Sequence, residues 1–178
     1  CHLTSLPKQK LSQGYQFVDW LHQQGFAYWQ MLPLTPPDKY DSPYASPSAF
    51  AGWKDLTDSN RDYPMDEDTY WLTDWALFCA IKESQNGKPW YEWPEALKDR
   101  KKEALEPFLE NLEPYLQQQR TFNAEWQELR SYANSNGIKI IGDVPIFIAH
   151  DSADVWAHRE LFQLDEEGYP TFIAGVPP

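Results

Sequence analysis

Cysteine is scarce in this sequence, and long apolar runs are missing. Only Cys1 and Cys79 occur among the 178 residues, which excludes the disulfide framework of small secreted proteins. No apolar run approaches the ~20 residues of a membrane-spanning helix, and the first residues show no signal-peptide pattern. We therefore expect a reduced, cytoplasmic protein. Cys1 is an unusual first residue, so we also expect the natural N-terminus to lie upstream.

Positive charge is also in short supply. The chain has 15 Lys and Arg residues against 27 Asp and Glu residues, which gives a formal net charge of −12. Binding to nucleic acid depends on cations that neutralise phosphates, and anionic membrane surfaces attract the same cations. The composition therefore argues against both partners and favours a neutral polar ligand.

Aromatic residues, in contrast, are abundant, at 16% of the chain with 9 Trp, 10 Tyr and 9 Phe. Flat rings lie well on the apolar faces of sugar rings, while carboxylates accept hydrogen bonds from sugar hydroxyls. This combination is typical of carbohydrate binding. Large aromatic side chains are also common core residues, and we expect most of these to be buried.

The apolar pattern alternates between strand and helix character. We predict strands near residues 2–6, 27–34 and 138–148, and a helix over residues 12–24 that Gly25 ends. Five Ile residues crowd the third of these segments, which predicts a strand buried on both faces of a parallel sheet. The fold class is therefore α/β, with the three strands as parallel neighbours.

Residues 53–136 are predicted to be mainly helical and to form an excursion between the second and third strands. We expect Pro107 and Pro114 to break up the middle of this region. Thr121 or Asn123 is expected to cap its last helix. The chain length of 178 residues allows one domain with a real core, but it is too short for a complete eight-stranded barrel of about 250 residues.

After the third strand we expect a short helix with Asp151 as its N-cap. Residues 161–164 and 170–174 then flank an acidic turn that ends in Gly168, the pattern of a β-hairpin. His150 beside Asp151 is compatible with a metal or proton-transfer site, but a surface histidine at a helix start is the more frequent case.

One carboxylate, Asp143, interrupts the apolar third strand. A charge inside a sheet is costly unless it is paired or hydrogen-bonded, and such a residue near the C-terminal end of a buried strand more often indicates function than packing. The alternative is a local cap on the turn before Pro145. The loop at 38–52 follows the second strand and contains Tyr44, so we expect it at the same end of the sheet, unless it is only a connector.

The chemistry-bearing motifs that would indicate other enzymes are absent. The sequence contains no Gly-rich phosphate loop, no serine nucleophile elbow and no metal-ligand cluster. The residues alone therefore lead to an α/β domain directed at a glycan, with Tyr44, Asp143 and Asp151 as candidates.

Several motifs then follow one another in order. The main ones are Trp29-Gln30-Met31-Leu32-Pro33-Leu34, Asp41-Ser42-Pro43-Tyr44, Ile140-Ile141-Gly142-Asp143-Val144-Pro145 and His150-Asp151-Ser152-Ala153-Asp154-Val155-Trp156. Residues 2–7, 48–52, 75–78, 87–94 and 174–178 add further segments. Together and in this order they resemble the 4-α-glucanotransferases, also called amylomaltases or disproportionating enzymes, of the α-amylase-like clan.

The resemblance implies an α-amylase-like (β/α)8 TIM barrel. Residues 1–178 would be a single partial catalytic domain that holds the first strands, with 53–136 as a helical insertion between the second and third barrel strands. It implies transfer of α-1,4-glucan segments between maltooligosaccharides by a retaining double displacement, in which an Asp nucleophile and a Glu acid/base flank the scissile bond. It implies no metal and no organic cofactor.

The matching motifs also imply roles for individual residues. Asp143 corresponds to the family's third-strand aspartate, which supports the active site without being the nucleophile. Tyr44 corresponds to a tyrosine that lines the donor-side sugar site, and Ser42 sits beside it. Asp151 is kept as a further substrate-binding candidate.

The chain also departs from the family pattern. The family's Arg-x-Asp nucleophile motif and Glu-Asp acid/base motif would both follow Pro178, so we expect about the first half of the enzyme, inactive alone. Lys8-Gln9-Lys10 replaces a Gly-rich segment, and Trp53 follows Gly52 where an Asn-Pro segment is expected; we therefore expect internal losses. Two other functions stay open: a non-catalytic α-glucan-binding module, and a structural fragment whose sheet edges pair with a partner.

Overall fold

The computed structural model describes residues 2–59, 63–64 and 69–173. Its helices and strands are α1 (Gln13–Gln23), β1 (Tyr28–Gln30), α2 (Leu72–Ser84), α3 (Glu95–Lys98), α4 (Lys102–Leu109), α5 (Glu113–Ser135), β2 (Lys139–Ile141) and α6 (Ala153–Ala157). Short 3-10 turns lie between them: η1 (Leu3–Ser5), η2 (Pro43–Ala45), η3 (Lys54–Leu56), η4 (Trp90–Glu92) and η5 (Arg159–Leu161). No helix in the described ranges has both the length and the apolar character needed to cross a bilayer.

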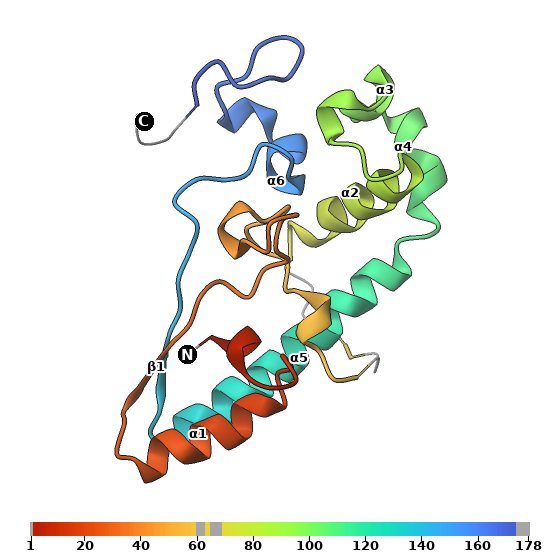
Figure 1. Ribbon diagram of the computed structural model, residues 1–178. Helices are drawn as coiled ribbons and strands as arrows, with labels where there is room; N and C mark the ends of the chain where they lie inside the picture. Colours follow the sequence, from red (N-terminus) through yellow and green to blue (C-terminus); the bar gives the residue numbers. More distant parts are fainter. Residues whose placement is uncertain (1, 60–62, 65–68, 174–178) are drawn as a thin grey trace.

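A small parallel sheet joins two distant parts of the chain. β1 and β2 run side by side with Trp29 opposite Ile140, and the Met31 N–H donates to the Ile141 carbonyl at 3.0 Å just beyond the strands. Figure 1 shows the two strands along one side of the molecule, with α1 and α5 beside them. The parallel relation of the second and third predicted strands is confirmed, although both strands are shorter than predicted.

The prediction of a strand near residues 2–6 is wrong. This segment forms η1, in which the Leu6 N–H donates to the Leu3 carbonyl at 3.0 Å. The backbone groups are therefore satisfied within a tight turn instead of in a ladder. Gln9 follows with a left-handed φ of 52°, which turns the chain directly into α1 instead of along a sheet edge.

The prediction that residues 138–148 are buried on both faces is also wrong. Ile138 is buried, but Val144 is 75% exposed and Ile146 is 89% exposed. The reason is that β2 has a partner on one side only: within the described part of the chain, the sheet consists of β1 and β2. The apolar pattern of this segment therefore does not lead to burial within the described residues.

Helix α5 starts earlier than predicted. Pro114 does not interrupt it, because Pro114 occupies the first turn, where its missing N–H has no intrahelical partner to lose. Thr121 and Asn123, the predicted caps, lie inside the helix. The Thr121 hydroxyl instead donates to the Gln117 carbonyl at 2.9 Å. Pro107 likewise lies inside α4.

Two hydrophobic cores lie at the two ends of α5 (Figure 1). The strand-side core packs α1 and β1 against the C-terminal half of α5, and its buried members include Val18, Leu21, Trp29, Leu129 and Ile138. The helical core packs α2, α3 and α6 together, and its buried members include Trp75, Phe78, Trp90, Trp93 and Trp156. The expectation that most aromatic residues are buried is wrong: among the described residues seven Trp and Phe side chains are buried, while ten aromatic residues are exposed.

Candidate functional site

The segments that leave β1 and β2 bring Tyr44 and Asp143 together. The Tyr44 hydroxyl donates a hydrogen bond of 2.7 Å to Asp143 Oδ2, and 99 positions separate the two residues in the sequence. Tyr44 is 41% exposed, and Asp143 is exposed as well, so the pair faces solvent. Parallel strands send their following segments out at the same end of a sheet, which explains why residues so distant in sequence meet here.

The second carboxylate oxygen of Asp143 makes a local contact. Asp143 Oδ1 accepts the Val144 N–H at 2.8 Å. This is the kind of contact expected if the aspartate only stabilises the turn before Pro145. The two interpretations coexist, because each uses a different carboxylate oxygen of Asp143. The two hydrogen bonds together hold the carboxylate in one orientation toward Tyr44.

The loop that carries Tyr44 is held by its own polar side chains. Asp38 Oδ1 accepts the N–H groups of Tyr40 and Ser42, each at 2.9 Å. The Thr35 hydroxyl donates to the Pro43 carbonyl at 2.9 Å. Ser42 is thus fixed through its backbone immediately before η2, the 3-10 turn that includes Tyr44, and it is half-buried.

The carboxylate also affects the acidity of the tyrosine. The hydrogen bond to Asp143 raises the pKa of Tyr44 above its ordinary value, with smaller contributions from desolvation and from the charge of Asp143. The phenol therefore keeps its proton at neutral pH and acts as a donor. A partly exposed ring beside an exposed carboxylate presents a stacking surface and a hydrogen-bond acceptor to the same ligand.

Asp143 lines an open cavity of about 240 Å³ at this end of the sheet. The walls come from the segments after both strands, from the end of the Tyr44 loop and from α5, and they include Leu32, Phe50, Trp126 and Pro145. The arrangement combines apolar rings with one carboxylate, which suits a polar ligand that also has apolar faces.

The far end of the Tyr44 loop is docked on α6. Asp154 Oδ2 accepts the Ala49 N–H at 3.0 Å, and the Ala153 N–H donates to the Pro47 carbonyl at 2.8 Å. Burial raises the pKa of Asp154. Asp154 belongs to the motif at residues 150–156, but no role was predicted for it. Its signal was a lone carboxylate among Ala153, Val155 and Trp156, all of which are buried.

Gln119 of α5 holds the same loop from another side. Its Oε1 accepts the Gly52 N–H at 2.8 Å, and its Nε2 donates to the Gly52 carbonyl at 3.0 Å. A Cβ atom on Gly52 would lie only 2.0 Å from the Phe122 ring, so a larger residue does not fit without rearrangement. Gln119 was not predicted as a buried residue, because a helical glutamine carries no sequence signal of burial.

Substitutions at Asp154 test how the loop is held. Asp154→Ala is expected to lower the free energy of unfolding by about 1–3 kcal/mol, because the Ala49 N–H loses its acceptor. Asp154→Asn keeps an acceptor oxygen and is expected to cost less. Urea unfolding of both variants and of the parent chain, at a series of pH values, measures these differences.

The pH dependence of Asp154 has a definite sign. Because its pKa in the folded state is raised above the ordinary 3.8, its stabilising contribution is greatest below the unfolded-state pKa and falls as pH rises through the folded-state pKa. As pH rises through this range, the parent chain should therefore lose stability relative to Asp154→Asn. Equal losses for the Asn and Ala variants at every pH would contradict the assignment.

Asp151 makes its contacts with the helical core. Its Oδ2 lies 2.6 Å from Lys82 Nζ, and its Oδ1 accepts the Trp90 N–H at 3.3 Å. The prediction that Asp151 caps α6 is wrong: Ser152 is the N-cap, in extended backbone, and its hydroxyl accepts the Val155 N–H at 3.2 Å. The structure does not show Asp151 bonded to the Tyr44–Asp143 pair, and its role in substrate binding stays a prediction.

His150 is packed between aromatic rings. Its ring lies parallel to that of Tyr91 with 4.3 Å between centroids, and its Nε2 lies 2.7 Å from the Gly168 carbonyl. It therefore fastens the acidic turn to the helical core. Across the described ranges, no group of three or more His, Cys, Asp or Glu residues is placed to hold a metal ion.

The predicted hairpin is confirmed in a minimal form. Leu164 and Pro170 form one antiparallel bridge, and the Thr171 N–H donates to the Gln163 carbonyl at 2.9 Å. Gly168 takes the left-handed φ of 93° that the turn requires. The end of its second arm, at Ala174, and the motif at 174–178 lie outside the described residues.

Comparisons with known proteins match the whole length of the chain. The family model described as 4-alpha-glucanotransferase matches residues 1–61 and 54–178. The 4-alpha-glucanotransferase of Aquifex aeolicus is 37% identical over 99% of this chain and 48% of its own length. That of Thermus thermophilus is 36% identical over 93% of this chain and 44% of its own length.

A solved structure agrees with these matches. Amylomaltase from Streptococcus agalactiae in complex with acarbose aligns with a TM-score of 0.89 at 33% identity, covering 99% of this chain and 48% of that chain. The chain therefore spans about half the length of the relatives it matches. The Aquifex alignment extends over 234 positions, more than the 178 residues of this chain, so the relative has residues inside the matched region that this chain lacks, as expected. Because the family model matches this chain along the chain's whole length, the chain belongs to the 4-alpha-glucanotransferase family, glycoside hydrolase family 77.

Proposed function

We propose that this chain is part of a 4-alpha-glucanotransferase that transfers α-1,4-glucan segments between maltooligosaccharides. Family membership along the whole chain supports the activity, and the acarbose complex of a structural neighbour supports a carbohydrate as the ligand. The excess of acidic over basic residues and the many aromatic rings fit a neutral sugar better than a charged polymer.

The observation that carries the site assignment is the hydrogen bond between Tyr44 and Asp143. In this proposal the exposed Tyr44 ring stacks on a glucose unit on the donor side, and Ser42 lies beside that unit. Asp143 accepts hydrogen bonds and supports the reacting centre without attacking the sugar. Asp151 is a more remote candidate contact for the glucan.

The proposed architecture is a (β/α)8 barrel in which β1 and β2 serve as the second and third strands and residues 53–136 form the helical insertion between them. The retaining reaction needs a nucleophile and an acid/base. The 178 residues contain no Arg-x-Asp triplet, and their one Glu-Asp pair, Glu67-Asp68, precedes the third predicted strand instead of following it. The part of the site described here therefore supplies binding and support.

A reducing compartment such as the cytoplasm is proposed for the protein, because two cysteines among 178 residues form no disulfide framework. Cys79 is a free thiol, and burial raises its pKa to about 12. A thiol with so little thiolate reacts slowly with disulfides, so Cys79 is better suited to packing than to redox chemistry.

Titration of the 178-residue chain with maltoheptaose tests the site. Removal of the Tyr44 hydroxyl in Tyr44→Phe takes one donor from Asp143, and loss of one hydrogen bond of this kind is expected to weaken sugar binding by roughly three- to tenfold. Tyr44→Ala also removes the ring and should weaken binding further. Isothermal titration calorimetry measures all three proteins.

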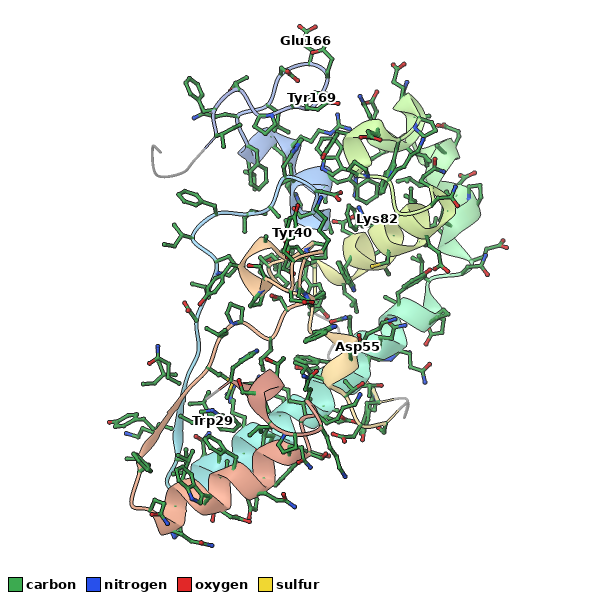
Figure 2. All side chains as sticks on the ribbon, in the orientation of Figure 1. Trp29, Tyr40, Asp55, Lys82, Glu166 and Tyr169 are labelled. Atoms are coloured by element: carbon green, nitrogen blue, oxygen red, sulfur yellow. The ribbon has the colours of Figure 1, made fainter. Side chains whose placement is uncertain are left out.

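Tyr169→Phe is the matched control, because Tyr169 is a similarly exposed tyrosine in the distant acidic turn (Figure 2). It should bind the glucan like the parent chain. Equal weakening by both Phe variants would count against the site. In the same preparations we expect no glucose release from maltotriose, and glucose above the buffer background would show that the catalytic carboxylates have been misassigned.

A further inference from the structure

Three rings gather where the acidic turn meets the helical core, and we call them the ring platform: Tyr91, His150 and Tyr169. Tyr91 and His150 stack in parallel with 4.3 Å between their centroids. The Tyr169 centroid lies 5.2 Å from that of Tyr91 and 6.1 Å from that of His150, and the planes of the two tyrosines are inclined by 52°. Figure 2 shows Tyr169 apart from Tyr40, which belongs to the Tyr44 loop.

The ring platform leaves aromatic faces open to a ligand. A ring stacked over the far face of Tyr91 would lie much farther from His150 than from Tyr91. Neither Tyr169 nor Trp90 does so, because Trp90 lies 5.8 Å from Tyr91 and 5.4 Å from His150 between centroids. Within the described residues, the second face of Tyr91 therefore carries no ring. Tyr169 is 46% exposed and Tyr91 is half-buried, so both rings are accessible for stacking on the apolar face of a sugar.

Polar groups flank the open rings. Among the described residues, neither the Tyr91 hydroxyl nor the Tyr169 hydroxyl has a hydrogen-bond partner. Burial raises the pKa of Tyr91, with smaller contributions from the charges of Asp151 and Glu92, so its phenol keeps its proton and stays a donor. Glu92 and Glu166 are exposed, and their carboxylates accept hydrogen bonds. The ring platform thus offers both donors and acceptors to the hydroxyls of a sugar.

The turn that carries Tyr169 is fixed by its own contacts. The Tyr169 N–H donates to Asp165 Oδ1 at 2.7 Å, and the Asp165 N–H donates to the Tyr169 carbonyl at 2.8 Å. Gly168 lies so close to Trp90 that a Cβ atom would come within 2.8 Å of the indole. Rings that are already held in place lose little conformational freedom on binding, which favours affinity.

We propose that the ring platform is a remote glucan-binding site, separate from the Tyr44–Asp143 site, which holds a distant part of a long α-1,4-glucan. The class of ligand rests on the proposed function. The formal charge of −12 and the carboxylates of the turn disfavour an anionic ligand, because like charges repel. An α-1,4-glucan curves, so that successive glucose units turn relative to one another. Two rings inclined by 52° match such a chain better than coplanar rings would.

Titration of the isotope-labelled 178-residue chain with maltoheptaose, followed residue by residue by NMR, tests the proposal. We expect the amide signals of residues 91–92 and 165–169 to shift and saturate, both in the parent chain and in Tyr44→Ala. Tyr91→Ala and Tyr169→Ala should each weaken binding at the turn roughly five- to tenfold, because each removes a stacking ring. Tyr169→Phe keeps the ring and should bind like the parent chain.

Tyr28→Ala is the control, because Tyr28 is an exposed tyrosine of β1, and it should leave binding at the turn unchanged. Circular dichroism checks that each variant folds. Absence of shifts at the turn overturns the ring platform, and shifts confined to the Tyr44 loop do so while leaving the proposed function intact. Shifts at the turn without shifts in the Tyr44 loop support the ring platform but count against the Tyr44 site.

Discussion

Gln119→Leu is expected to lower the free energy of unfolding by about 2–6 kcal/mol. The glutamine side chain is 3% exposed and satisfies both backbone groups of Gly52. Leucine would leave a buried N–H and a buried C=O without partners, at about 1–3 kcal/mol each. A loss of this size is a large fraction of the 5–15 kcal/mol that typically holds a domain together. Urea unfolding followed by circular dichroism measures it.

The control for this substitution lies on the same helix. Gln127 is an exposed residue of α5, so Gln127→Leu should change stability by less than about 0.5 kcal/mol. Loss of the Gly52 contacts should also loosen the end of the Tyr44 loop, and maltoheptaose affinity should fall in Gln119→Leu alone. If both variants unfold at the urea concentration of the parent chain, Gln119 does not carry the loop.

Trp156→Ala is expected to lower the free energy of unfolding by about 3–5 kcal/mol, the usual cost of removing a large buried aromatic side chain. Trp156 of α6 is fully buried. Its indole N–H donates to the Leu97 carbonyl at 3.0 Å, its ring meets Trp93 edge-on at 5.6 Å between centroids, and the Arg100 guanidinium lies 4.3 Å above it. Thermal and urea unfolding measure the loss.

Trp156→Phe separates packing from hydrogen bonding at this position. Phenylalanine keeps a ring for Trp93 and Arg100 but leaves the Leu97 carbonyl without its donor, so it should cost less than alanine and still more than about 1 kcal/mol. An alanine variant as stable as the phenylalanine variant would show that the helical core closes over the cavity without loss.

Local signals in the sequence predicted local structure well. Helix α1 was predicted almost to its ends, because Gly25, with its left-handed φ of 75°, is a strong C-terminal signal. The acidic turn before Gly168 was predicted for the same reason. The early start of α5 was missed, because a proline in the first turn of a helix and a proline between two helices look alike in sequence.

The rest depended on tertiary contacts that sequence patterns do not reveal. An Ile-rich segment predicts burial, yet Ile146 is 89% exposed. Tyr44 and Asp143 were predicted as site residues from motifs and strand order, and the structure joins them. Asp154 and Gln119 were missed, because the backbone groups that they hold belong to a loop more than 60 positions away in the sequence.

Helix α5 borders both cores, with Tyr115 and Leu116 packed on one and Leu129 and Ala133 buried in the other. The energies of the two cores are therefore coupled through one rigid element, so that residues in separate cores contribute to one cooperative unit of unfolding. Amide hydrogens along all of α5 should become less protected from exchange when either core is opened. The Tyr44 loop is tied to this helix through Gln119, and its Ala51 is buried in the helical core, so we expect the loop to open when either core opens.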